Sequence, residues 1–70
     1  MRQEDCVFGS DVKLNIPGSR DDGQVGEIKS YPEEGMIRGV KGHLLVVELR
    51  MSFKRKNIIV RADEIEPKKD

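Results

Sequence analysis

The chain has little of several residue types on which enzymes and metalloproteins depend. Its 70 residues include one cysteine, one histidine, no tryptophan and three aromatic side chains, and the formal net charge is zero. A single cysteine excludes an internal disulfide and any cysteine-pair zinc site. No catalytic constellation and no metal-ligand set is apparent. We therefore expect a non-enzymatic protein with no cofactor and no bound metal.

A secretory signal and long apolar runs are also missing from the sequence. Their absence predicts no membrane span and a cytoplasmic location. A chain this short has a small core and little room for a deep pocket, so we expect no small-molecule substrate. Cys6 has no histidine or other base near it in sequence, which favours a buried thiol over a reactive one.

Short alternating patterns, separated by glycine and proline, are what the chain does contain. Val12, Leu14 and Ile16 alternate with polar residues, which predicts a strand with one solvated face over residues 11–16. The pattern resumes over residues 24–30. Val25 and Ile28 lie three positions apart, so we expect both to point inward across a β-bulge at Gly26.

The second half of the chain predicts two further strands, over residues 43–51 and 58–60, joined by a polar turn over residues 52–57. Residues 44–47 form a continuous apolar run, which predicts cover on both faces. Residues 31–42 indicate a long loop with at most a brief strand at 36–38. Residues 61–64 predict a short helical or 3-10 turn, followed by a last strand residue, Ile65.

No helical apolar stripe of any length appears, so the fold class is predicted as all-β. A small SH3-like barrel of about five short antiparallel strands, with a short 3-10 turn near the C-terminus, fits this order because closure removes the open edges of short strands. Residues 1–70 are expected to form one domain with a core over about residues 7–66. The N-terminus is expected to fray, and the C-terminal tail is charged.

Five segments carry a resemblance to known families. They read GSDVKL, DDGQVGEI, LLVVEL, NIIV and ADEIEP, and they span about Gly9 to Glu66. In this order they resemble the SH3-like barrels of KOW-type modules in ribosomal and transcription-elongation proteins. They also resemble the electron-transport accessory group, which includes the small barrel subunit of photosystem I and the variable subunit of ferredoxin-thioredoxin reductase. The first resemblance implies nucleic-acid or ribonucleoprotein binding, and the second implies docking within a larger protein complex.

The zero net charge hides an uneven distribution along the chain. Residues 1–34 hold four Lys and Arg against eight Asp and Glu, residues 35–61 hold seven against one, and residues 62–70 hold two against four. A basic block therefore lies between two acidic flanks. Such a block bears on what the chain binds rather than on how it folds.

The basic residues concentrate at the predicted hairpin between the last two strands. Cations at a protruding tip can neutralise phosphates, and an aromatic among them can stack on an unpaired base. The alternative is a solvated turn with Phe53 packed on its own barrel. The candidate contact residues are Arg50, Phe53, Lys54, Arg55 and Lys56, and Arg38, Lys41 and His43 would extend them if residues 31–42 fold alongside.

Two other motifs are weaker candidates. Asp21-Asp22 and Glu33-Glu34 are paired carboxylates, but adjacent carboxylates in a flexible loop lack the fixed geometry that catalysis needs, so we expect solvated residues. Gly23 to Gly26 lacks the following lysine and the helix of a phosphate-binding loop. Two functions stay open: a module that contacts RNA, DNA or a ribonucleoprotein through the basic hairpin, or a docking subunit for a larger protein complex.

Overall fold

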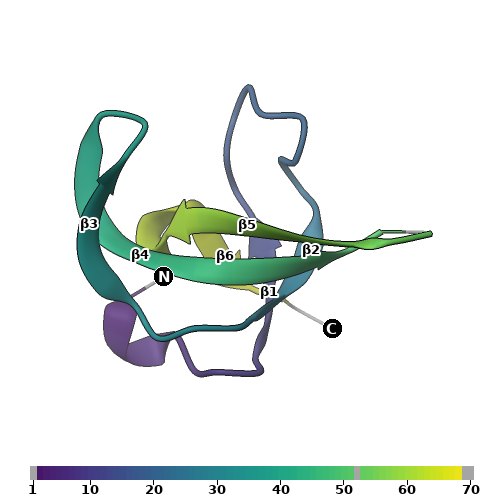
Figure 1. Cartoon of the computed structure of the whole chain (residues 1–70), viewed down its shortest axis with the longest axis horizontal. Helices are drawn as coiled ribbons and strands as arrows, with labels where there is room; N and C mark the ends of the chain where they lie inside the picture. Colours follow the sequence, from purple (N-terminus) through teal and green to yellow (C-terminus); the bar gives the residue numbers. More distant parts are fainter. Residues whose placement is uncertain (1, 52, 69–70) are drawn as a thin grey trace.

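The computed structural model describes residues 2–51 and 53–68, and it contains six antiparallel strands that curl into a half-barrel (Figure 1). Met1, Ser52, Lys69 and Asp70, which belong to the predicted frayed start, polar turn and charged tail, lie outside the described residues. The elements in chain order are η1 (Gln3–Asp5), β1 (Asp11–Leu14), β2 (Val25–Ile28), β3 (Glu33–Ile37), β4 (Val40–Arg50), β5 (Arg55–Arg61), η2 (Ala62–Glu64) and β6 (Ile65–Pro67). The all-β prediction is confirmed, with six strands where about five were expected and a 3-10 turn near the C-terminus.

Strand β4 is the centre of the sheet. Its N-terminal half pairs with β3, its C-terminal half pairs with β2, and its other edge pairs with β5 over residues 44–50. From β2 the sheet continues through β1 to β6, so the strand order is β3-β4-β2-β1-β6 with β5 beside β4. One strand thus joins both hairpins to the rest of the sheet.

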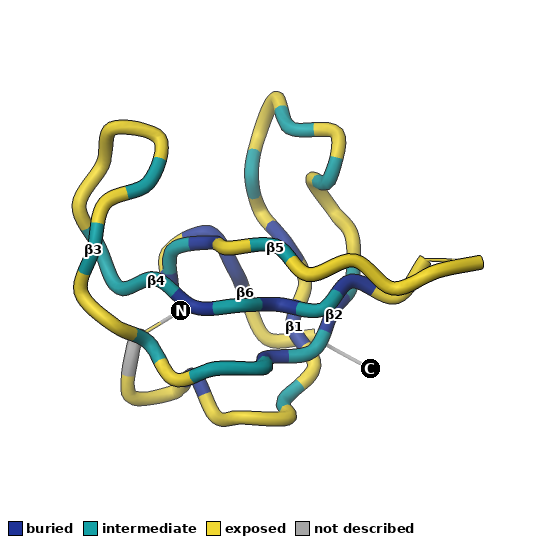
Figure 2. The backbone as a smooth tube through the Cα atoms, in the orientation of Figure 1, coloured by how far each residue is buried: buried dark blue, intermediate teal, exposed yellow. Residues whose placement is uncertain are grey.

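The core is built almost entirely from aliphatic side chains on the inner face of this sheet (Figure 2). Strand β1 alternates as predicted, with Val12 and Leu14 buried and Asp11 and Lys13 exposed. The buried residues are Cys6, Val12, Leu14, Ile28, Leu45, Val47, Leu49, Val60, Ala62 and Ile65. Cys6 therefore joins the core one position before its predicted start, next to the η1 turn.

The predicted β-bulge at Gly26 is wrong. Strand β2 pairs without an extra residue, with Gly26 opposite both Val12 of β1 and Leu49 of β4. Gly26 and Ile28 point into the core, whereas Val25 lies on the opposite face and is half-buried. A Cβ at Gly26 would lie 2.6 Å from Val47 Cγ1 and 2.7 Å from the Glu48 carbonyl oxygen. The glycine is needed because β4 approaches closely, not because the strand bends there.

The sheet is instead interrupted between β2 and β3. From Ile28 to Glu33 the chain advances five residues, while their partners on β4, Val47 and Leu44, are only three apart. Two extra residues are therefore accommodated in the connection. The Ser30 hydroxyl oxygen accepts the Val46 N–H at 2.8 Å, and so replaces the backbone acceptor that the ladder lacks at this point.

The predicted long loop over residues 31–42 is also wrong, because most of it forms a hairpin. Strand β3 pairs with the start of β4 across a two-residue turn, Arg38-Gly39, whose φ values are 53° and 75°. Two positive φ values are typical of the type I′ turn, which matches the twist of hairpin strands. The predicted strand over residues 43–51 accordingly begins earlier, at Val40, and the predicted strand over residues 58–60 extends to Arg55–Arg61.

Replacing Gly26 with alanine tests the close approach of β2 and β4. The new methyl group would meet core and backbone atoms that cannot move freely, so we expect Gly26→Ala to lower the free energy of unfolding by about 1–3 kcal/mol. Gly42→Ala is the matched control, because the atoms nearest its methyl group belong to the Arg61 side chain and not to the backbone, and the closest of them would lie 3.0 Å away. Urea denaturation measures both. Equal effects of the two substitutions would contradict the packing described here.

Candidate nucleic-acid interface

The hairpin that joins β4 and β5 projects from one end of the molecule (Figure 1). Its strands pair up to Arg50 and Arg55, and beyond them the Met51 N–H donates a hydrogen bond to the Lys54 carbonyl at 3.0 Å. The strand pairing therefore extends further toward the tip than the predicted turn allowed. Lys56 and Asn57, expected in the turn, belong to β5.

Phe53 stands fully exposed at this tip, with a relative accessibility of 102%. It does not pack on its own barrel, so the predicted packing of Phe53 in the alternative reading is wrong, while a solvated turn stays open. Beside it, Lys54 is exposed and forms no ion pair with any described residue. An uncovered aromatic ring next to an uncommitted cation is the arrangement that stacks on a base while it neutralises a phosphate.

The other cations of the hairpin are held by carboxylates. Arg50 donates to Glu27 Oε1 at 2.8 Å and lies 3.5 Å from Asp11. Lys56 lies 3.6 Å from Asp21 in the loop between β1 and β2. Both residues lie at the base of the hairpin, where their side chains remain 55% and 44% exposed.

Arg55 is intermediate between these two situations. Its guanidinium lies 3.7 Å from Glu48, but its side chain remains 78% exposed. Exposed ion pairs of this length contribute little to stability, so the guanidinium can exchange Glu48 for a phosphate at small cost. Of the predicted contact residues, the three at the tip, Phe53, Lys54 and Arg55, are therefore the least engaged in contacts within the fold.

Arg38, Lys41 and His43 are not brought to this tip. All three lie in or beside the β3–β4 hairpin, at the other end of β4 (Figure 1). Arg38 is paired with the buried carboxylate of Glu64, which also accepts the Arg61 N–H at 2.9 Å. Residues 31–42 thus do not fold alongside the basic hairpin, and the patch is not extended by them.

Of the paired carboxylates, Asp21 and Asp22 make contacts within the fold, whereas Glu33 and Glu34 are exposed, as expected for solvated residues. Asp22 Oδ1 accepts the Ile16 N–H at 2.8 Å, and Asp21 pairs with Lys56. Among residues 2–51 and 53–68 no group of three or more His, Cys, Asp or Glu side chains is arranged to hold a metal ion. In the same described part, no helix is long and apolar enough to cross a membrane.

Cys6 is buried, as predicted from its sequence context. Its Sγ donates a hydrogen bond of 3.3 Å to the Arg2 carbonyl oxygen. Burial raises the pKa of the Cys6 thiol, which keeps it protonated near neutral pH. The thiol is therefore part of the N-terminal packing and does not contribute a nucleophile.

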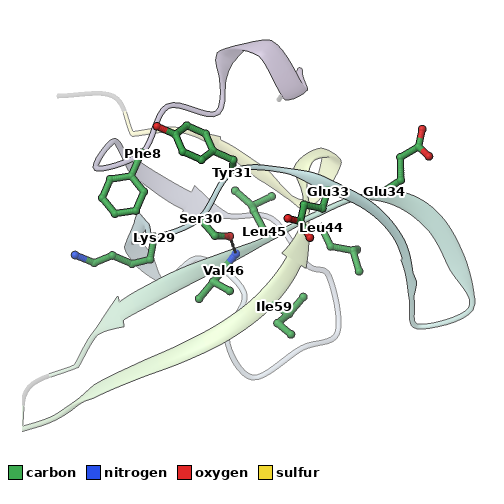
Figure 3. A pocket seen from close by; sticks show the side chains of 10 residues that line it. All are labelled: Phe8, Lys29, Ser30, Tyr31, Glu33, Glu34, Leu44, Leu45, Val46 and Ile59. Atoms are coloured by element: carbon green, nitrogen blue, oxygen red, sulfur yellow. Dashed lines mark hydrogen bonds between the residues drawn. The ribbon is translucent and has the colours of Figure 1, made fainter.

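Sequence reasoning missed a groove on the outer face of the sheet. It lies over Leu44, Val46 and Ile59 and is bordered by Phe8 and Tyr31 (Figure 3). The signal was present in the run over residues 44–47, where Leu44 and Val46 occupy the outward positions of β4. The prediction that this run is covered on both faces is met only in part, because both outward side chains are half-buried.

Comparison of the chain with protein-family models, with curated proteins and with solved structures finds no match.

Acidification tests the ion pairs at the base of the hairpin. The hydrogen bond from Lys29 and then that from Arg50 lower the pKa of Glu27 below its ordinary value of 4.5, although partial burial opposes the shift. A carboxyl group whose pKa is lowered by folding stabilises the fold above its unfolded pKa and loses that contribution as the pH falls below it. We expect Glu27→Gln to be less stable than the wild type at neutral pH, and the difference to shrink below about pH 4.5.

Urea midpoints measured from pH 7 to pH 3 give this comparison. Glu66→Gln is the control, because Glu66 is exposed and forms no ion pair with a described residue. A difference between wild type and Glu27→Gln that stays constant over this range would show that the ion pairs do not stabilise the fold.

Proposed function

We propose that the chain is a non-enzymatic binding module that contacts single-stranded nucleic acid through the tip of the β4–β5 hairpin. The observation that carries the proposal is the full exposure of Phe53 beside Lys54 and Arg55. A Phe side chain held in water at a hairpin tip gains nothing for the fold, whereas stacking on a base would bury it. Duplexes, whose bases are already stacked, offer this ring no partner.

We infer that the half-barrel is SH3-like, which supports the same reading. The supporting features are the long loop between β1 and β2, the β4–β5 hairpin, and the η2 turn that returns the chain to pair with β1 through β6. KOW-type modules, which the sequence resembles, are SH3-like barrels of nucleic-acid-associated proteins.

The electrostatics predict weak and modestly salt-dependent binding. Lys54 and Arg55 provide two cations for phosphates, while Arg50 and Lys56 are already paired. Each phosphate neutralised on a single strand contributes about −0.7 to the slope of log K against log salt, so two contribute about −1.4. The acidic residues at the base of the hairpin prevent the contact from spreading across the sheet.

Fluorescence anisotropy with a labelled single-stranded RNA, the matching DNA strand and their duplex tests the proposal. We expect binding to either single strand with a salt slope near −1.4, and weaker binding to the duplex. Phe53→Ala should weaken binding by about tenfold through lost stacking, with little change in slope. Lys54→Ala should reduce the slope by about 0.7.

Lys41→Ala is the matched control, because Lys41 is an exposed hairpin lysine at the other end of β4 and forms no ion pair with a described residue. It should leave both affinity and slope unchanged. Absence of binding at low salt, or equal losses from Lys41→Ala and Lys54→Ala, would overturn the proposal.

Docking to a protein is the second candidate function. The ion pairs of Arg50 and Lys56 favour it, because they leave a hairpin with little free positive charge. It would be supported if a pull-down recovers a protein partner that is lost when Lys54, Arg55 and Lys56 are all replaced by alanine.

A further inference from the structure

A groove of about 580 Å³ opens to solvent on the outer face of β4 and β5, away from the basic hairpin tip (Figure 3). It is lined by the outward residues Leu44, Val46 and Ile59, by the core residue Leu45, and by the rings of Phe8 and Tyr31. The volume lies within the range of ligand-binding pockets. Apart from Leu45, these residues belong neither to the core nor to the hairpin contact.

The outward residues of the groove break the alternation that a solvated sheet face requires. Leu45 and Val47 point into the core, so the neighbouring positions on β4 point outward and should be polar. Val46 instead lies directly opposite Ile59 of β5, and Ile59 is 52% exposed. A row of aliphatic side chains on an outward face is typical of an interface.

The aromatic wall is held in place by the backbone. The Gly9 N–H donates to the Ile28 carbonyl at 2.8 Å, and the Ile28 N–H donates to the Ser10 carbonyl at 3.0 Å. These bonds fasten the N-terminal segment to β2, directly after Phe8. The Phe8 and Tyr31 rings lie 6.2 Å apart and are tilted by 38°, within the range of favourable aromatic pairs, so the wall is preformed.

The charges around the groove select the chemistry of its occupant. Glu33 lies beside Leu44, and Glu34 follows it at the same end with its side chain turned outward (Figure 3). Neither carboxylate forms an ion pair with a described residue. Lys29, at the other end, is held by Glu27 at 2.6 Å. The rim is thus negative, which repels nucleic acid and attracts a basic group.

We propose that this groove docks a segment of a partner protein that carries large apolar side chains next to lysine or arginine. The apolar side chains lie between the two rings and Ile59, and the basic residue lies against Glu33, with Glu34 adding negative charge at the same end. The chain then joins two ligands, a peptide on the sheet face and nucleic acid at the hairpin tip. The joining of two ligands rests on the proposed function, whereas the docking of the peptide does not, because the two surfaces share no residue.

Selection of a random library of short linear peptides against the immobilised protein tests the proposal. We expect the enriched peptides to combine apolar residues with Lys or Arg, and to lose about tenfold or more in affinity for Tyr31→Ser and for Ile59→Ser. Glu33→Gln combined with Glu34→Gln should weaken the same peptides by roughly threefold to tenfold and reduce their salt dependence.

Met36→Ser is the matched control, because Met36 is an apolar side chain, 60% exposed, that does not line the groove. It should bind the peptides as the wild type does, and circular dichroism checks that all variants fold. No enrichment, an acidic consensus, or peptides that bind Tyr31→Ser and Ile59→Ser as well as wild type would overturn the proposal. So would a wild-type dimer in sedimentation that Ile59→Ser dissociates, since the occupant would then be a second copy.

The two binding surfaces are separable by the same variants. Tyr31→Ser should retain nucleic-acid binding, and Phe53→Ala should retain the selected peptides. If the wild type binds one of the two ligands but not the other, only the proposal for the ligand that does not bind is wrong.

Discussion

The pairing of β4 along both of its edges is the constraint on which the rest of the structure depends. This strand of eleven residues supplies Leu45, Val47 and Leu49 to the core and holds β2, β3 and β5 by backbone hydrogen bonds. A core of ten mostly aliphatic side chains is small, so the strands must lie close together. Gly26 makes that closeness possible on one edge, and the Ser30 hydroxyl completes the ladder where β2 gives way to β3.

The charges of the chain are separated along the sequence but brought together in the fold. Asp11, Asp21 and Glu27, from the acidic first part, lie against Arg50 and Lys56 of the basic block. Glu64, from the acidic C-terminal part, forms ion pairs with Arg38 and Arg61. The positive segment is therefore largely compensated, and what remains for a partner is Lys54 and Arg55 at the hairpin tip and Lys41 at the other end of β4. A count along the chain overstates the basic surface because it ignores these contacts.

The sequence predicted those elements that depend on the pattern of neighbouring residues alone. Val12 and Leu14 alternate with charged residues, and this period of two predicted β1 because one face of the strand is solvated, although β1 ends at Leu14 and not at the predicted residue 16. The η2 turn near the C-terminus also followed from its short sequence. The β4–β5 hairpin was predicted for the same reason, although its strands extend further toward the tip than the residues indicate.

The errors arise where distant segments decide the structure. Strand β3 has mostly exposed side chains and forms because β4 offers it an edge, so Glu33–Ile37 carries no apolar period to read. Its turn places Arg38 at a positive φ, which a sequence does not signal as clearly as glycine or asparagine would. Gly26 indicated a position where the backbone is unusual. Only the position of Val47 shows that a glycine is needed there because β4 lies too close for a side chain. The outer groove could not be predicted without knowing which face of β4 points into the core.

All three aromatic rings lie outside the core, so near-ultraviolet and far-ultraviolet spectra report on different parts of the molecule. Phe8, Tyr31 and Phe53 are all exposed, and the chain has no tryptophan. Near-ultraviolet absorption and fluorescence therefore come from side chains at the surface, in the groove and at the hairpin tip, while the aliphatic interior gives no signal. In this molecule the tyrosine signal follows the environment of the groove, and loss of the fold is recorded by the far-ultraviolet signal of the backbone.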